Sequence, residues 1–229
     1  MIKKIIKIIC SSENPFLKFI GDLIRFPVIF FQYVLFSFQK DKKTVDLIKK
    51  IRKEKNSPMY PSEMAQVCFL TVYAMNLSGD FAEVGVYTGG SAKLICENKG
   101  NKNLHLFDTF RGFPKLGSKD DAILDKKIFS ADLDEVKVYL KNYKNVFFHE
   151  GVFPDTAKFA ENIRFSFVHL DVDLYESTLE GLKFFYPRMV EKGVILVHDF
   201  SNLNGVRSAV NEFTDKSIEL STSQCIIIK

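Results

Sequence analysis

The chain has 229 residues, 46% of them hydrophobic, and a formal net charge of +4. This length suits a single α/β domain with a short addition, and the apolar fraction suffices for a large core. Apart from clusters at residues 3–7 and 40–43, the positive charges are scattered. This argues against a nucleic-acid-binding protein, which usually carries one strongly basic face. Cys10, Cys68, Cys96 and Cys225 show neither a CxxC pair nor zinc-ligand spacing, which indicates reduced thiols in a cytoplasmic protein.

Residues 1–57 are predicted to form a helical N-terminal extension. Within it, 26–38 reads FPVIFFQYVLFSF, an apolar run of thirteen residues. Because a membrane-spanning helix needs about 20 apolar residues, we expect none here. Two alternatives remain for the helix predicted at 16–38. It packs against the domain or a second subunit, as in a homodimer, or it lies on a membrane surface as a peripheral contact.

Residues 58–229 alternate between predicted helices and strands. Pro61 begins a helix that Ser78-Gly79-Asp80 ends. Apolar runs then predict strands at 81–86, 104–108, 146–151, 165–171 and 193–199. Helices are expected at 91–98, 133–143, 155–162, 177–190 (bent at Pro187) and 205–216, and two short strands in 218–229. The alternation predicts a doubly wound α/β fold with a mostly parallel sheet.

Residues capable of binding and catalysis follow the predicted strands. Doubly wound sheets bind ligands beyond the carboxyl ends of their strands, so we expect these residues to lie together. They are Glu83, Gly85, Tyr87, Gly89 and Ser91 around the first strand end, Asp108 after the second, Glu150 and Gly151 after the third, Asp171 and Asp173 after the fourth, and His198 and Asp199 after the fifth.

The glycine turn after the first strand discriminates between cofactors. A dinucleotide site needs the pattern G-x-G-x-x-G, and the second glycine of that pattern is missing here. Glu83 would repel a pyrophosphate but would suit the amino group of a methionine moiety. Asp108, 23 residues beyond Gly85, is placed to bind a ribose. The turn therefore favours S-adenosylmethionine over NAD.

Five segments carry a family resemblance: EVGVYTGGSA (83–92), LFDTFRGFP (106–114), HEGVFPDTA (149–157), HLDVDLYESTLEGLKFFYPRM (169–189), and GVILVHDF with GVRSAV (193–210). They resemble the macrocin O-methyltransferase family, whose members methylate sugar hydroxyls on macrolides and related glycosides. The resemblance extends over residues 58–229 and says nothing of residues 1–57.

The resemblance implies a class I methyltransferase fold, whose seven-stranded sheet has its last strand antiparallel. It implies an S-adenosylmethionine-dependent O-methyltransferase acting on a small-molecule or glycan acceptor through a sugar hydroxyl. Glu83 and the turn from Gly85 to Gly89, with Tyr87, would hold the methionine end of the cofactor. Asp108 would hold the ribose, and the stretch 150–152, with Gly151, would lie near the adenine. We also assign Ser91 and Asp171 to the cofactor site.

The same resemblance implies magnesium dependence, with Asp171 and Asp199 as metal ligands and Asp173 as general base. The family commonly has Asp-Asp-Tyr after the fifth strand, where this chain has His198-Asp199-Phe200. Histidine suits transition metals better than Mg2+. A water could take the missing place, the metal could differ, or the site could be metal-free. His198 is accordingly a candidate ligand, outer-shell donor or replacement base.

Rival interpretations remain. Asp171 and Asp173 could simply cap the helix that follows them. A catechol-type O-methyltransferase would use a similar metal site with a flatter, more aromatic acceptor pocket. A non-catalytic, membrane-associated cofactor-binding module would not need the acids Asp171, Asp173 and Asp199. A nucleic-acid methyltransferase would carry Asn/Asp-Pro-Pro-aromatic after the fourth strand, which the sequence at 171–174 lacks.

Overall fold

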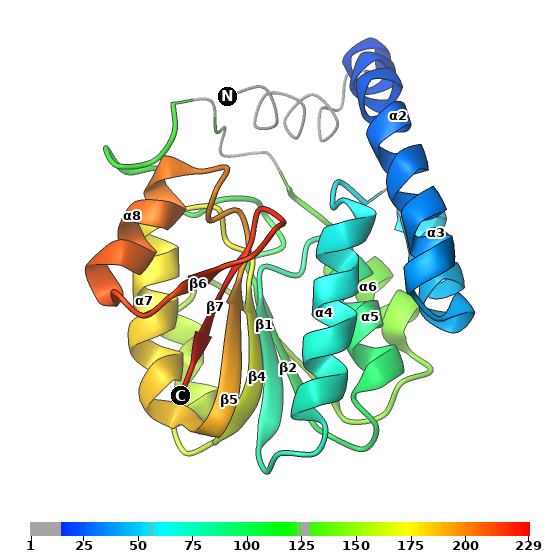
Figure 1. Cartoon of the computed structure of the whole chain (residues 1–229). Coiled ribbons are helices and arrows are strands. Elements are labelled where there is room, and N and C mark those ends of the chain that lie inside the picture. The colour runs from blue at the N-terminus through cyan, green and yellow to red at the C-terminus, as the bar shows by residue number, and fades with distance from the viewer. Residues whose placement is uncertain (1–14, 56, 123, 125–128) are drawn as a thin grey trace.

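The computed structural model of the protein describes residues 15–229 except 56, 123 and 125–128. The predicted features at residues 1–14, including Cys10 and the lysines at 3–7, lie outside the described residues. Figure 1 shows a central sheet with helices on both sides. This is the doubly wound α/β fold that the strand–helix alternation predicts.

The sheet has seven strands in the order β3-β2-β1-β4-β5-β7-β6. The strands are β1 (Asp80–Val84), β2 (Leu104–Asp108), β3 (Val146–Glu150), β4 (Phe165–Leu170), β5 (Met189–Val197), β6 (Ile218–Glu219) and β7 (Cys225–Ile228). The first five are parallel, and β7 runs antiparallel to both β5 and β6. The seven-stranded sheet with a reversed last strand is thus confirmed. The strand order reverses beside β1, which is where such sheets bind ligands.

Two layers of helices cover the sheet (Figure 1). On one side lie α4 (Pro61–Ala74), α5 (Gly90–Asn98) and α6 (Leu133–Leu140), and on the other α7 (Tyr175–Phe185) and α8 (Asn204–Phe213). Short 3-10 helices span Asp155–Ala160 and Tyr186–Arg188. Alternate strand residues enter opposite layers, so Phe81 packs with the first layer and Ala82 with the second.

The helix predicted at 177–190 is too long. α7 ends at Phe185, Pro187 lies in a 3-10 turn, and β5 already begins at Met189. Because proline cannot donate the hydrogen bond that would continue a helix, it ends α7 rather than bending it. The segment 155–162 likewise forms a 3-10 helix over Asp155–Ala160 instead of an α-helix.

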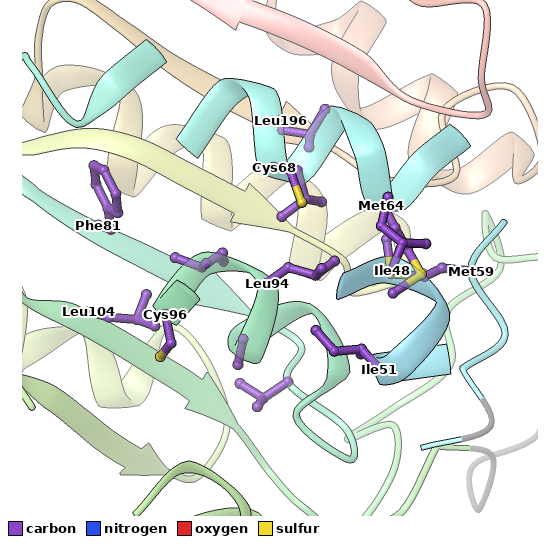
Figure 2. Packing of buried hydrophobic residues seen from close by; sticks show 14 of the residues in the cluster. Ile48, Ile51, Met59, Met64, Cys68, Phe81, Leu94, Cys96, Leu104 and Leu196 are labelled. Atoms are coloured by element: carbon purple, nitrogen blue, oxygen red, sulfur yellow. The ribbon is translucent and has the colours of Figure 1, made fainter. Parts of the chain in front are cut away.

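The N-terminal segment forms two helices that differ in how they pack. In α3 (Lys42–Lys55), Val45, Ile48 and Ile51 are buried. Figure 2 shows Ile48 and Ile51 near Met59, which precedes α4, and near Met64 of α4 and Leu94 of α5. Cys68 and Cys96 lie in the same core cluster, as predicted. α3 is therefore part of the core.

By contrast, α2 (Pro15–Gln39) stands at the periphery of the molecule (dark blue in Figure 1). Only a narrow stripe faces the domain, and Gly21, Arg25 and Phe36 are buried along it. Gln32, on the same stripe, accepts a hydrogen bond from the backbone N–H of Ser62. Its large hydrophobic residues are mostly exposed: Phe16, Phe19, Leu23, Ile24, Phe26, Val28, Phe30, Phe31, Val34, Leu35 and Phe38. The helix therefore contacts the domain through a narrow stripe of mixed polarity and leaves most of its apolar surface exposed.

Candidate functional site

A cavity opens at the carboxyl ends of β1 to β5, where the sequence predicts the site. Its walls come from the glycine turn after β1, the ends of the next four strands, the loop after β2 and the segment before α4. The predicted residues that line it are Gly85, Tyr87, Ser91, Asp108, Gly151, Asp171, Asp173, His198 and Asp199.

Gly85 is a glycine because β4 passes directly beside it. Its φ is +89°, and a Cβ at this position would lie 1.9 Å from the backbone oxygen of Asp171. The backbone N–H of Asp171 donates to the oxygen of Val84 at 2.9 Å, which holds the two strand ends together. The glycine therefore lets Asp171 reach the rim of the cavity, a reason that the sequence did not reveal.

Asp108 fixes the glycine turn from the end of β2. Its Oδ2 accepts hydrogen bonds from the N–H groups of Val86 at 2.6 Å and Tyr87 at 2.8 Å, and its Oδ1 accepts from Phe110 at 2.7 Å. Burial raises the pKa of Asp108, and these backbone donors oppose that rise. Asp108 therefore holds the glycine turn in place while it lines the cavity wall.

Two predicted cofactor residues do not line the cavity. Glu83 is fully buried in β1, where its Oε1 lies 2.8 Å from Nδ1 of His169 in β4. The parallel register places these two residues side by side, and burial raises the pKa of Glu83. Gly89 faces α6, where its Cβ would meet Val136 at 3.1 Å. Both residues lie directly behind the cavity wall, next to the lining residues Val84 and Gly90, and their assignment to the cofactor stays a prediction.

Asp171, His198 and Asp199 form a compact group at the cavity rim. Nδ1 of His198 lies 3.0 Å from Oδ2 of Asp199 and 3.3 Å from Oδ1 of Asp171. One ligand atom from each of the three residues lies within 4.8 Å of the other two. Burial alone would lower the pKa of His198, but the neighbouring carboxylates of Asp171 and Asp199 raise it to about 10. The two carboxylates therefore favour the protonated form of this imidazole.

The rim also contains backbone in an uncommon conformation. Asp173 and Asp199 have φ values of 58° and 56°, in the left-handed region that non-glycine residues rarely adopt. Such residues cluster at functional sites, where the surrounding structure holds them in place. Both lie directly beyond strand ends and line the cavity. The geometry therefore presents their side chains together with Asp171 at one edge.

The sequence also suggests that the helices before Gly79 shape the pocket, but it does not single out the lining residues Arg25, Tyr60, Glu63 and Asn202. The amide of Asn202 donates to Oδ1 of Asp199 at 2.9 Å. Oε2 of Glu63 lies 3.7 Å from Nε2 of His198 and accepts from the N–H of Tyr60 at 2.7 Å. The only sequence signal was Glu63 at the third position of a helix, which indicates capping rather than a cavity.

The loop after β2 forms a further wall and contacts the glycine turn, since the ring of Phe129 lies 5.4 Å from that of Tyr87. Gly112, Phe113, Pro114 and Phe129 of this loop line the cavity. Two neighbouring acids anchor it to the second helical layer. Oδ1 of Asp120 accepts from the first N–H of α7 at 2.7 Å, and Oδ2 of Asp121 from the first N–H of α8 at 2.9 Å. The loop is thus fastened to the two helices that follow the carboxylate-bearing strands.

Together, the reversed seventh strand, the glycine turn with an acid from β2, and the carboxylates after β4 and β5 define a Rossmann-like fold of the class I methyltransferase type. The chain belongs to the macrocin O-methyltransferase family, whose model matches residues 62–222. The resemblance identified from the sequence is therefore confirmed.

Three relatives illustrate the family. One relative is an 8-demethyl-8-(2,3-dimethoxy-alpha-L-rhamnosyl)-tetracenomycin-C 4'-O-methyltransferase of Streptomyces olivaceus. The two chains are 30% identical over 165 residues, and the match covers 65% of this chain and 62% of the relative. The chain is 28% identical to a demethyldecarbamoylnovobiocin O-methyltransferase of Streptomyces niveus, over 67% of this chain and 65% of the relative. It is 26% identical to a mycinamicin III 3''-O-methyltransferase of Micromonospora griseorubida, over 66% of each. The match thus spans less than two thirds of each relative.

Solved structures share the fold. The O-methyltransferase NovP superposes with a TM-score of 0.66 at 23% identity, over 76% of this chain and 81% of that one. The calicheamicin methyltransferase CalS11 superposes with a TM-score of 0.64 at 16% identity, over 82% of this chain and 93% of that one.

Proposed function

We propose that the protein transfers a methyl group from S-adenosylmethionine to a hydroxyl of a sugar or glycoside. The observation that carries this proposal is the convergence of Asp171 and Asp199 at the cavity rim, beside a glycine turn that suits this cofactor. Two of the three relatives are named as O-methyltransferases of glycosides, which supports a sugar acceptor. The family itself supports O-methylation.

Bound S-adenosylmethionine would supply an electrophilic methyl carbon to the acceptor oxygen, and the hydroxyl proton would have to pass to a base. The protein contributes orientation and a base. Asp173 is assigned as the base because it lines the cavity two residues beyond Asp171. Asp171 and Asp199 place negative charge where the hydroxyl has to be held.

A divalent cation fits the group formed by Asp171, His198 and Asp199. One ligand atom from each of these residues lies within 4.8 Å of the other two, so all three could hold one cation. A set of one imidazole and two carboxylates favours Mn2+ or another transition ion over Mg2+. The bound cation would lower the pKa of the acceptor hydroxyl. In its absence, a proton on His198 supplies the compensating charge.

The purified protein is expected to bind S-adenosylhomocysteine and not NAD. The physical reason is that the turn lacks the glycine that a pyrophosphate needs for close approach. Calorimetry with both ligands checks this, and binding of NAD alone would contradict the proposal. Mass spectrometry of reactions with glycosides, sugar nucleotides and catechols then tests the acceptor. Methylated catechols without methylated sugars would favour the catechol-type alternative.

We also propose that the protein associates peripherally with a membrane through α2. The segment Phe19–Gln39 is long and apolar enough to cross a bilayer by length and composition, although the run 26–38 alone is too short. Arg25 and Gln32 are, however, hydrogen-bonded to the domain, which favours a helix lying flat. Lys40, Lys42 and Lys43 follow the apolar surface directly. Lysines near a bilayer favour anionic lipids, by about 1 kcal/mol each.

The double variant Phe26→Asp/Phe30→Asp is expected to lose most of its binding to vesicles containing phosphatidylglycerol. These stacked rings, 64% and 59% exposed, would otherwise enter the acyl region, where a charge is unfavourable. Vesicle co-sedimentation measures the effect, and Val138→Asp, at an exposed apolar site in α6, is the matched control. Unchanged sedimentation, or a dimer that the double variant dissociates, would contradict the membrane assignment.

A further inference from the structure

Arg25 of α2 reaches from the peripheral helix into the wall of the cavity. The residue is 3% exposed, although it belongs to a helix whose surface is otherwise largely open. Its Nη2 donates to the backbone oxygen of Pro58, and its guanidinium carbon lies 4.8 Å from the centre of the Tyr60 ring. Its Nε is buried without a hydrogen-bond partner among the described residues.

Among the described residues, no carboxylate pairs with the buried positive charge of Arg25. Arginine keeps its proton under all ordinary conditions, and burying a charge is costly unless it is paired. No ion pair joins Arg25 to a carboxylate in the described part of the chain. A carbonyl and an aromatic face offset the charge in part but do not neutralise it. The compensating anion is therefore expected to come from a bound molecule.

We infer that Arg25 forms a subsite for an oxyanion, a carboxylate or phosphate, on a molecule bound in this cavity. A planar guanidinium with several N–H donors matches the geometry of such groups. The inference rests on the proposed function, because it places the anion on the cofactor or on the acceptor. The cofactor offers the carboxylate of its methionine moiety, and an acceptor would offer the phosphate of an activated sugar or the carboxylate of an acidic one.

A second arginine provides a matched control. Arg52 of α3 donates to the backbone oxygen of Met59, as Arg25 does to that of Pro58. Both residues therefore fasten the same segment, but Arg52 does not line the cavity. Loss of either side chain removes a hydrogen bond to this segment. Only loss of Arg25 also removes the positive charge from the subsite.

The test compares Arg25→Gln and Arg52→Gln with the wild type by calorimetry. The probes are S-adenosylhomocysteine, methylthioadenosine (which lacks the methionine carboxylate) and inorganic pyrophosphate added to the S-adenosylhomocysteine-bound and free protein. We expect Arg25→Gln to weaken at least one anionic probe by about tenfold or more and to leave methylthioadenosine unchanged. Arg52→Gln should change none of them, at a similar melting temperature.

Each outcome has one meaning. A loss for S-adenosylhomocysteine assigns the subsite to the cofactor carboxylate, and a loss for pyrophosphate assigns it to a phosphate of the acceptor. If Arg25→Gln binds all three probes as the wild type does, or if Arg52→Gln shows the same losses, the subsite is refuted. If the protein binds no S-adenosylhomocysteine, the proposed function is refuted. If it still binds pyrophosphate and Arg25→Gln weakens that binding, the subsite is supported independently of the proposed function.

Discussion

The Asp199→Asn variant is expected to lose methyl transfer by about 10²–10⁴-fold while it binds S-adenosylhomocysteine within a few-fold of the wild type. Asn is nearly isosteric and can still accept the hydrogen bond from Asn202, so the change removes charge rather than shape. Asp199 is 1% exposed and belongs to the group that would hold a cation and orient the acceptor. Steady-state kinetics with the identified acceptor and calorimetry with S-adenosylhomocysteine separate the two effects.

Metal removal extends the same experiment. Dialysis against a chelator should abolish turnover reversibly, and we expect Mn2+ to restore it better than Mg2+ because His198 supplies nitrogen. His198→Asp should shift this preference toward Mg2+, since it gives an all-oxygen set. Asp215→Asn, an exposed acid near the end of α8, is the control and should behave as the wild type. A full rate in excess chelator would show that the metal assignment is wrong.

The Gly85→Ala variant is expected to lose both folding stability and cofactor binding. Its Cβ would overlap the backbone oxygen of Asp171 at 1.9 Å, and its φ of +89° is unfavourable for alanine. Because the obstacle is backbone of a central strand, neither side can move cheaply. We expect a loss of at least about 4 kcal/mol in the free energy of unfolding, which denaturant titration measures.

Gly90→Ala in the same turn is the matched control. The nearest atoms to its Cβ are 3.7 Å or more away, and its φ is not positive. Alanine at this first helical position should therefore be neutral or stabilise the protein by a few tenths of a kcal/mol. If Gly85→Ala unfolded at the same denaturant concentration as Gly90→Ala, the close approach of β4 to the turn would be wrong.

The strands and their polar ends could be predicted because each depends on a short stretch of sequence. The second strand was placed at its observed bounds, Leu104–Asp108, since an apolar run and the acid that ends it are local features. Asp171, His198 and Asp199 could be grouped because parallel strands bring their carboxyl ends to one edge of the sheet.

The remaining features depend on contacts between distant segments. Glu83 could be recognised as a costly buried acid, but its partner His169 lies 86 residues away and is set by strand register. Arg25 lies in a helix that nothing in its own sequence directs toward the cavity. Pro187 indicated a break, yet whether it bends or ends a helix depends on where β5 must begin. Such features follow from packing rather than from local pattern.

The anchored loop after β2 has a consequence for how acceptor preference can diverge. Asp120 and Asp121 attach it to the N-termini of α7 and α8, and an isolated bridge joins Arg111 to Ser130 at its base. The cavity-lining residues Phe113 and Pro114 lie between these fixed points. Under the proposed function, mutations there would change the wall that meets the acceptor while the carboxylates keep their positions. Acceptor preference could then change through one short surface segment, without changes to the residues at the strand ends.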